Sequence, residues 1–168
     1  METLIVLRGV SGSGKSTFTN MVKKSFPNLV HCSADFYFEG PTGYKFDASK
    51  LSEAHGQCFR TAIHAMIERA SMVVVDNTNM TLIELAPYVQ AGKAFGYNVQ
   101  IAQMIATVDD AAARNVHGVP TAGVSRQHYK FEQTPPFWPP TKTFVTGTLD
   151  RPVSDPTQEQ VDAWLKSL

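Results

Sequence analysis

Eight residues near the start of the chain form a pattern that is typical of phosphate binding. Gly9-Val10-Ser11-Gly12-Ser13-Gly14-Lys15-Ser16 matches G-x-x-x-x-G-K-[ST] at every fixed position. Glycines leave the backbone N–H groups free to wrap an anionic phosphate, and the N-terminus of a following helix adds a favourable dipole. The pattern therefore predicts a loop that binds the phosphates of ATP, although a glycine-rich turn without a ligand would share its composition.

The expected nucleotide-binding residues lie in this loop or directly after it. They are Gly9, Ser11, Gly12, Ser13, Gly14, Lys15, Ser16 and Thr17. Lys15 would place a point charge on the β and γ phosphates and therefore also counts as a catalytic candidate. We expect the Ser16 hydroxyl to ligate Mg²⁺ and Thr17 to contact the α-phosphate. ATP and Mg²⁺ are thus the expected cofactors.

Two aspartates follow apolar runs that predict strands. Asp76 ends the run 72–75, so we expect it to hold Mg²⁺ with Ser16, although the sequence Asp-Asn-Thr-Asn would also form a good turn by itself. Asp35 lies just past a second predicted strand, at the edge of the sheet where ligands collect. A carboxylate there can take the proton of an acceptor hydroxyl, which makes Asp35 the candidate general base. A helix cap or a second metal ligand are the alternatives.

Residues 109–132 are predicted to form a small helical lid. Arg114 lies near the end of a short predicted helix, and a bend-forming sequence with glycine and proline follows it. An arginine that reaches across a transferring phosphoryl group stabilises its charge, so Arg114 is the first catalytic candidate in the lid and Arg126 the second. Both could instead be solvated surface charges. We expect His117 and His128 to be structural histidines, although either could contact phosphate.

Two further segments allow more than one interpretation. The first is aromatic and contains Phe36, Tyr37, Phe38, Tyr44 and Phe46. These rings could form a stacking platform for a nucleobase, or they could simply cover the core. The second segment, Pro135 to Pro140, could dock a partner as an extended chain. We favour a rigid connector whose Trp138 packs on the domain.

The elements that would position these residues alternate between strands and helices. Short apolar runs predict strands at residues 4–7, 29–33, 72–75, 99–105 and 141–146. Periodicity predicts helices at 15–25, 48–70, 82–95, 111–116 and 121–132, followed by a terminal helix that bears Val161 and Trp164. The expected helix caps are Asp47, Thr81, Asp109 and Asp155, and residues 36–46 are expected to form a loop. This order predicts an α/β fold with about five parallel strands and helices on both faces.

Length and composition restrict the class of protein. The 168 residues, 43% of them hydrophobic and 18% charged, allow one well-buried domain over residues 1–168. Lys and Arg number 15, as do Asp and Glu, which excludes the global positive field of non-specific duplex binders. No apolar run is long enough to span a membrane, so we expect a soluble cytoplasmic protein of open oligomeric state. Cys32 and Cys58 are expected to be buried thiols, because two cysteines make no disulfide framework.

Four segments together resemble the phage-type polynucleotide 5′-hydroxyl kinases and their relatives. The segments are GVSGSGKST, CSADFYF, VVVDNTN and RNVHGVP, and the resemblance spans roughly residues 3–132. The relatives include the kinase-like domains of the NEDD-binding and myelin cyclic nucleotide phosphodiesterase proteins. The resemblance implies a P-loop kinase fold, Mg²⁺-ATP as phosphate donor and the 5′-hydroxyl of DNA or RNA as acceptor. It also implies Asp35 as base, Asp76 at the metal and Arg114 in the lid.

Two positions depart from the phage pattern. The phage enzymes place an arginine that binds the acceptor's phosphate three residues after the base, and this chain has Phe38 there. They also place a second arginine in the lid, where this shorter lid has His117-Gly118. The first expectation is therefore an ATP-dependent kinase that acts on a 5′-hydroxyl polynucleotide. A nucleoside or small-molecule kinase and a nucleotide-binding switch without phosphotransfer are the alternatives.

Overall fold

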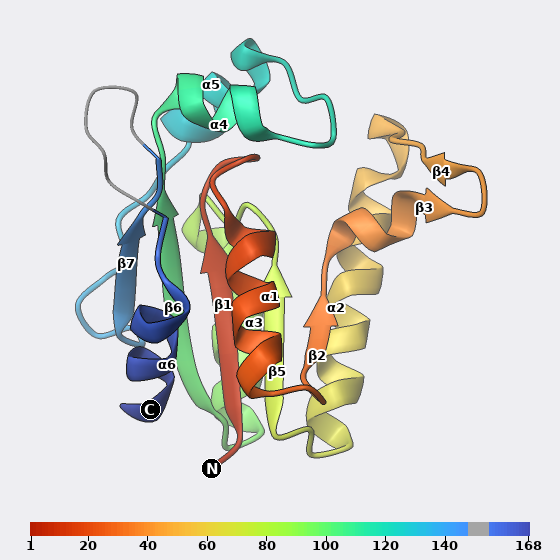
Figure 1. Ribbon diagram of the computed structural model, residues 1–168. Coiled ribbons are helices and arrows are strands. Elements are labelled where there is room, and N and C mark those ends of the chain that lie inside the picture. The colour runs from red at the N-terminus through yellow and green to blue at the C-terminus, as the bar shows by residue number, and fades with distance from the viewer. Residues whose placement is uncertain (148–154) are drawn as a thin grey trace.

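A parallel sheet of five strands forms the centre of the computed structural model, which describes residues 1–147 and 155–168 (Figure 1). The strands are β1 (Thr3–Arg8), β2 (Val30–Cys32), β5 (Met72–Asp76), β6 (Asn98–Ile105) and β7 (Thr141–Val145). Their order across the sheet is β2-β5-β1-β6-β7. The predicted α/β class and the parallel arrangement are confirmed, and each predicted strand is present to within a few residues.

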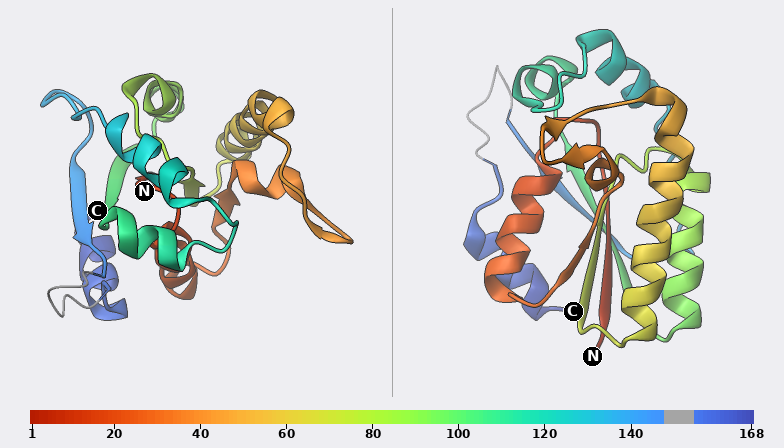
Figure 2. Two further views of the ribbon diagram at one scale, coloured as in Figure 1. Left: turned by 90° about the horizontal axis from the view of Figure 1, so that it is seen from above. Right: turned by 90° about the vertical axis from the view of Figure 1, so that its right-hand side faces the viewer.

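Helices cover both faces of this sheet, as predicted (Figure 2). On one face, α1 (Lys15–Ser25) and α6 (Gln158–Lys166) pack against alternate strand residues such as Ile5 and Val74. On the other face, α2 (Leu51–Ile67) and α3 (Leu82–Ala94) pack against the intervening residues, including Leu4 and Val73. All six residues of β1 are buried because each face of the strand has a helical layer.

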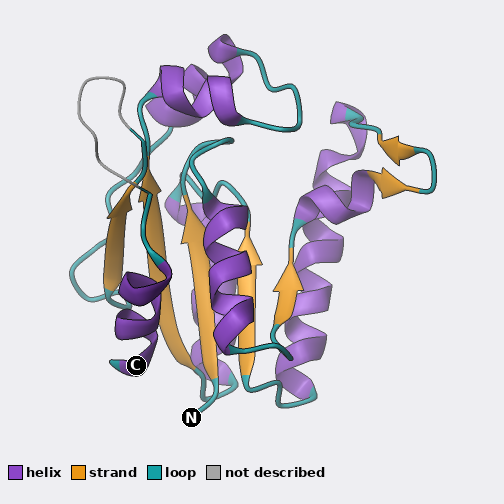
Figure 3. Cartoon of the chain, viewed as in Figure 1, coloured by secondary structure: helices purple, strands orange, loops and turns teal. Residues whose placement is uncertain are grey.

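The parallel direction of the strands brings their carboxyl ends to one edge of the sheet (Figure 3). β1 and β5 pair in a register that places Leu7 opposite Asp76. The phosphate-binding loop, which follows β1, and Asp76 therefore begin at the same level of the sheet. This edge is where a doubly wound α/β fold binds its ligands.

The segment between β2 and α2 is more regular than the predicted loop. Residues Ala34–Phe38 form a 3₁₀ helix, which leads into a two-stranded antiparallel hairpin of β3 (Glu39–Gly40) and β4 (Gly43–Tyr44). A second 3₁₀ turn, Ala48–Lys50, precedes α2, and Asp47 caps that turn as predicted by accepting a hydrogen bond from the Ser49 backbone. The hairpin projects from the body of the molecule beside α2 (Figure 1).

Two of the predicted helix caps are wrong. The helix α4 (Val108–Arg114) is capped by Thr107, which accepts from the Asp110 backbone, and not by Asp109. The terminal helix α6 is capped by Thr157 in a capping box with Gln160, and not by Asp155. Both threonines have the spacing that lets a hydroxyl reach the N–H three residues later. In α3 the predicted box is present, since Glu84 accepts from the Thr81 backbone N–H at 2.9 Å.

The remaining helix, α5 (Thr121–Tyr129), follows α4 above the carboxyl ends of β1 and β6 (Figure 1). Both cysteines are buried free thiols, as expected. Trp138, in the proline-rich segment, packs against the core cluster on the α2–α3 face, which agrees with a connector that packs on the domain. None of the helices in residues 1–147 and 155–168 combines the length and apolar character that a membrane span requires.

Candidate functional site

The phosphate-binding loop has a backbone shape that only glycine can adopt at its centre. Gly12 has a φ of 80°, and a Cβ atom there would lie 1.9 Å from the backbone oxygen of Ala111 in α4. The loop and α4 are therefore in direct backbone contact. Gln127 of α5 braces the same loop, because its side-chain oxygen accepts from the Ser11 N–H at 2.8 Å and its amide nitrogen donates to the Ser11 hydroxyl at 3.0 Å.

Lys15 extends back into the curve of this loop. Its ammonium donates to the carbonyl oxygens of Gly9 and Val10, each at 3.0 Å. Burial lowers the pKa of the Lys15 amine, and the negative charges of Asp76 and Asp35 oppose that shift. A phosphate held by the loop amides would meet this ammonium, which matches the role expected of Lys15.

Ser16 and Asp76 converge on one point beside the loop. The Ser16 hydroxyl donates to Oδ2 of Asp76 at 2.9 Å, and Nε2 of His31 lies 3.2 Å from the same oxygen. Burial opposes ionisation of Asp76, but the hydrogen bonds of His31 and Ser16 and the charge of Lys15 outweigh it, so the pKa of Asp76 is lowered. A carboxylate that favours its ionised form, next to a hydroxyl, is the hard oxygen donor set that suits Mg²⁺, so these residues fit the expected ion.

Asp35 approaches the same region from the 3₁₀ helix. Its side chain is 46% exposed, whereas that of Asp76 is 4% exposed. Tyr44 donates from its hydroxyl to Oδ1 of Asp35 at 2.9 Å, and Nε2 of His117 lies 3.6 Å from Oδ2. Asn77 fixes the start of the 3₁₀ helix against the end of β5, since its side-chain oxygen accepts from the Ala34 N–H at 2.9 Å.

The two candidate arginines lie in different places. Arg114, the last residue of α4, donates to Oδ1 of Asp155 at 3.0 Å and to the Thr146 hydroxyl at 3.2 Å. Thr146 in turn donates to the backbone oxygen of Ser13 at 2.7 Å, so Arg114 is connected to the phosphate-binding loop. Arg126 is exposed on α5 and does not line the cavity described next, so the structure does not bring it to this site.

A cavity of about 340 Å³ joins most of the expected residues. Its lining comes from the loop and the start of α1, the 3₁₀ helix after β2, the end of β5, the end of α4 with the turn that follows it, and Asp155. The side chains and backbone that line it are Ser11, Gly12, Gly14, Lys15, Ser16, Thr17, Asp35, Asp76, Asn77, Thr78, Arg114, Asn115, Val116, His117 and Asp155. Of the expected nucleotide-binding residues, Gly9 and Ser13 are outside this lining, and the Ser13 side chain is fully buried beneath the loop.

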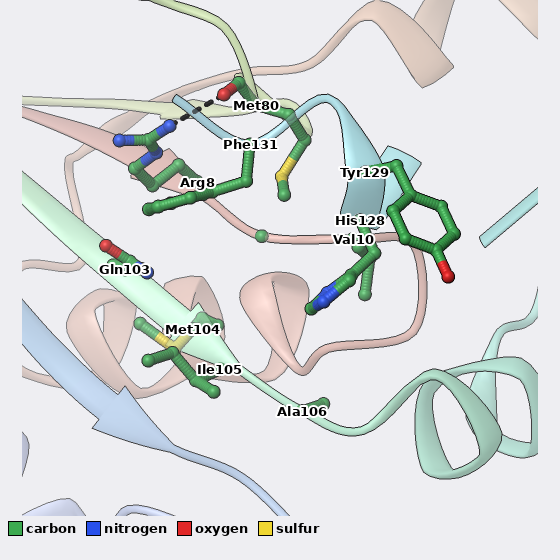
Figure 4. Close-up of a pocket in the computed structure, with 11 residues that line it drawn as sticks. Arg8, Val10, Met80, Gln103, Met104, Ile105, Ala106, His128, Tyr129 and Phe131 are labelled. Atoms are coloured by element: carbon green, nitrogen blue, oxygen red, sulfur yellow. Dashed lines mark hydrogen bonds between the residues drawn. The ribbon is translucent and has the colours of Figure 1, made fainter. Parts of the chain in front are cut away.

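A second cavity, of about 430 Å³, lies at the phosphate-binding loop but shares no lining residue with the first (Figure 4). It is mostly apolar, and α5 contributes His128 and Tyr129 to it. The buried Arg8 at its wall donates to the backbone oxygens of Met80, at 2.8 Å, and Glu132, at 2.9 Å. Arg8 thereby ties the segment after α5 to the sheet. The first cavity contains the carboxylates and the lysine, so we place the candidate site there.

The aromatic residues of the 36–46 segment mainly cover the core. Phe38 is buried in the core cluster on the α2–α3 face, and Phe46 packs on it with ring centroids 5.1 Å apart. Phe36 is 42% exposed and contacts the His31 ring edge-on. Only Tyr44, through its hydroxyl, reaches a candidate catalytic residue. Phe38 therefore cannot replace the acceptor-binding arginine of the phage pattern.

Five residues of the site were not expected from the sequence in these roles: His31, Tyr44, Asn77, His117 and Gln127. Four of them meet a partner that lies far away in the chain, and Tyr44 reaches back nine residues to Asp35. His117 was expected to be structural, yet it lines the cavity and faces Asp35. Only the closeness of a polar residue to a motif residue, such as Asn77 after Asp76, could have indicated a role in the site from the sequence.

The parallel sheet, its strand order and the phosphate-binding loop define a P-loop kinase fold. The chain belongs to a family of AAA domains, whose family model matches residues 4–131. It is 33% identical over 133 residues to human NEDD4-binding protein 2, a match that covers 76% of this chain and 8% of that protein. The chain therefore spans a small part of this relative's length.

Solved structures show the same fold at low sequence identity. A gluconokinase from Sinorhizobium meliloti superimposes with a TM-score of 0.63 and 18% identity, over 98% of this chain and 90% of that chain. A chain of the Pnkp1/Rnl/Hen1 RNA repair complex superimposes with a TM-score of 0.64 and 19% identity, over 77% of this chain and 43% of that chain. The fold is thus shared by proteins that differ in substrate.

Proposed function

We propose that this protein is an ATP-dependent kinase that transfers the γ-phosphate to a hydroxyl group, with the 5′-hydroxyl of DNA or RNA as the first acceptor to test. The observation that supports it most strongly is the position of Asp35. Its half-exposed carboxylate lines the same cavity as Lys15, Ser16 and Asp76. A protein that only binds a nucleotide has no need of a second, accessible carboxylate facing the phosphate site.

Each residue in the cavity has a role in this proposal. The loop amides and Lys15 hold the β and γ phosphates, and Ser16 with Asp76 would hold Mg²⁺, which when bound would neutralise phosphate charge. Asp35 takes the proton of the acceptor hydroxyl as its oxygen bonds to the γ-phosphorus and ADP leaves. Arg114, near the loop through Thr146, stabilises the charge of the transferring group.

We also propose that residues 1–168 act as one kinase domain in which residues 109–132 are the lid. The backbone contact between Gly12 and Ala111 and the bracing of Ser11 by Gln127 support this assignment, because they connect both helices of that segment to the phosphate-binding loop. Closure of such a segment excludes water from the reacting phosphate and aligns the catalytic groups.

The test is transfer of radiolabel from γ-labelled ATP to 5′-hydroxyl DNA and RNA oligonucleotides in the presence of Mg²⁺. Lys15→Ala is the blank, and the same oligonucleotides with a 5′-phosphate are the acceptor control. Label in the 5′-hydroxyl oligonucleotide alone, absent with the blank, is the expected result. Apparent acceptor affinity should then fall steeply with added salt, as phosphate contacts require.

A small-molecule acceptor is the second candidate, and the burial of Phe38 favours it. Phe38 stands where the phage pattern has its acceptor-binding arginine, and because it is buried in the core it cannot contact a nucleic-acid phosphate. The fold also matches that of a gluconokinase. ADP release with gluconate or nucleosides, at a rate that does not depend on salt, would identify this class. ATP binding without transfer to any hydroxyl would contradict both candidates and indicate a nucleotide-binding switch.

A further inference from the structure

Asp35 is held from two sides by groups on different segments. The Tyr44 hydroxyl of β4 donates to Oδ1 at 2.9 Å, and Nε2 of His117, from the turn after α4, lies 3.6 Å from Oδ2. The Tyr44 and His117 rings also contact each other, with centroids 4.4 Å apart and planes inclined by 36°. The three side chains therefore form a closed set in which each member contacts the other two.

The turn that presents His117 is braced by a single side chain. Asn115, directly after α4, accepts from the Val119 N–H at 2.8 Å and donates to the Val119 carbonyl oxygen at 2.9 Å. The same amide nitrogen donates to the Ala112 carbonyl oxygen at 2.8 Å, which ties the turn to α4. These bonds close the turn at both ends, so His117 projects from a defined backbone position.

A half-exposed carboxylate on a short 3₁₀ helix needs such contacts if it is to act as a base. Without them the Asp35 side chain would exchange between rotamers, and fixing it in one rotamer during the reaction would cost conformational entropy. Proton abstraction and attack on phosphorus require the reacting atoms to be aligned at about 3 to 3.5 Å. Tyr44 engages Oδ1 at hydrogen-bond distance, whereas Oδ2 has His117 beside it at 3.6 Å and keeps the capacity to accept a proton.

We propose that His117 is a positioning residue for phosphate transfer: together with Tyr44 it orients the Asp35 carboxylate toward the acceptor hydroxyl. This inference rests on the proposed function. His117 takes no part in the bonds that form and break, because the hydroxyl proton goes to Asp35 while the γ-phosphorus leaves ADP for the acceptor oxygen. The residue that aligns the base thus comes from the proposed lid, so the turn must lie over the cavity before Asp35 is aligned.

Single-turnover transfer to the 5′-hydroxyl DNA oligonucleotide tests this role. We expect His117→Ala to lower the transfer rate about 10- to 100-fold, with the affinity for ATP unchanged. His117→Gln should recover most of the rate, because its amide nitrogen can reach the same oxygen, and Tyr44→Phe should lower it as His117→Ala does. The control is His64→Ala, an exposed histidine of α2 outside the candidate site, which should leave the rate unchanged. A wild-type rate in His117→Ala, or equal losses in the Ala and Gln variants, would overturn the inference.

A second measurement separates this inference from the proposed function. Amide hydrogen exchange of residues 116–118 reports on the turn without any need for catalysis. We expect Asp35→Ala to speed exchange there, because His117 loses its partner, whereas Asp109→Asn, an exposed change on α4, should not. Unchanged exchange in Asp35→Ala overturns the inference whatever the activity. Faster exchange in a protein that phosphorylates no acceptor would support the contact and reject the kinase proposal.

Discussion

The two carboxylates of the site differ in environment although they line one cavity. Asp76 is buried and accepts from Ser16 and His31 on one oxygen, and its pKa is lowered despite the cost of burial. Asp35 is half-exposed, and Nε2 of His117 lies 3.6 Å from its Oδ2. An ionised, shielded carboxylate suits a metal ligand, and an accessible one suits proton transfer.

Replacement of the accessible carboxylate should separate transfer from binding. We expect Asp35→Asn to lower the single-turnover transfer rate about 100-fold or more, because the amide cannot accept the acceptor's proton. ATP affinity, measured by calorimetry, should change little, since the residues that hold the phosphates are untouched. Asp109→Asn is the matched control. Residual transfer near the wild-type rate would mean that another group acts as the base.

At the scale of elements, the loop after β1 and the start of the 109–132 segment are packed backbone to backbone. The Ala111 carbonyl occupies the space that any side chain at residue 12 would need. The position of α4, and with it those of Arg114 and the turn that follows, therefore depends on the absence of one Cβ atom. Because α4 lies this close to the loop, Arg114 can donate to Thr146, which in turn donates to the backbone of Ser13 in the loop.

Gly12→Ala should consequently displace α4 and weaken nucleotide binding. The variant combines an unfavourable positive φ, which costs about 1 to 2 kcal/mol, with a backbone clash that cannot relax locally. Gly96→Ala is the control, because Gly96 has a φ of 77° but no atom within 4 Å of the added Cβ. Thermal unfolding should show a loss in both variants, larger for Gly12→Ala. Only Gly12→Ala should lose ATP binding, and equal ATP affinities in the two would refute the clash.

The sequence was informative where local pattern determines structure. The glycine spacing predicted the loop, the apolar run before Asp76 predicted β5, and Thr81 with Glu84 predicted the start of α3. The caps of α4 and α6 were missed because acidic residues near the helix starts were preferred over Thr107 and Thr157. The second of these could have been found, since Thr157 and Gln160 have capping-box spacing.

Contacts between distant segments could not be predicted from the sequence. His31 meets Asp76, and His117 meets Asp35, only because the sheet brings the ends of β2 and β5 together below the turn after α4. Neither histidine belongs to a periodic pattern or a motif with fixed spacing. The expectation that His117 is structural followed from how common that role is, and only the folded arrangement shows that it faces the candidate base.

At the scale of the whole molecule, the buried ionisable groups determine how stability depends on pH. Burial raises the pKa of the Cys32 thiol from 9.0 to about 12, and the neighbouring Cys58 adds to the shift. The folded state keeps the proton in a range where the unfolded chain has lost it. Stability from this group is therefore complete below pH 9 and is lost as the pH rises toward 12.

Removal of this thiol should make the unfolding free energy fall less steeply as the pH rises above 9. Above pH 9, the unfolding free energy of the wild type should fall more steeply than that of Cys32→Ala, by about 1.4 kcal/mol per pH unit. Urea unfolding at pH 8, 9, 10 and 11 measures the difference. At pH 8, where the thiol is protonated in both the folded and the unfolded state, the variant should be less stable than the wild type only because it leaves a small gap in the core. Parallel pH profiles for the two proteins would show that Cys32 does not titrate on unfolding.

The central place of β1 also has a consequence for biosynthesis. This strand pairs with β5 on one side and with β6 on the other, and these partners begin at Met72 and Asn98. At ribosomal rates of about 5 to 20 residues per second, the interval between Arg8 and Ile105 is roughly 5 to 20 s. β1 therefore lacks both of its hydrogen-bonding partners until β5 has been synthesised, and it lacks the second partner until β6 follows. We therefore expect the nascent chain to expose the apolar β1 for several seconds, and the loop that follows β1 to become fully ordered only once β5 and β6 have been made.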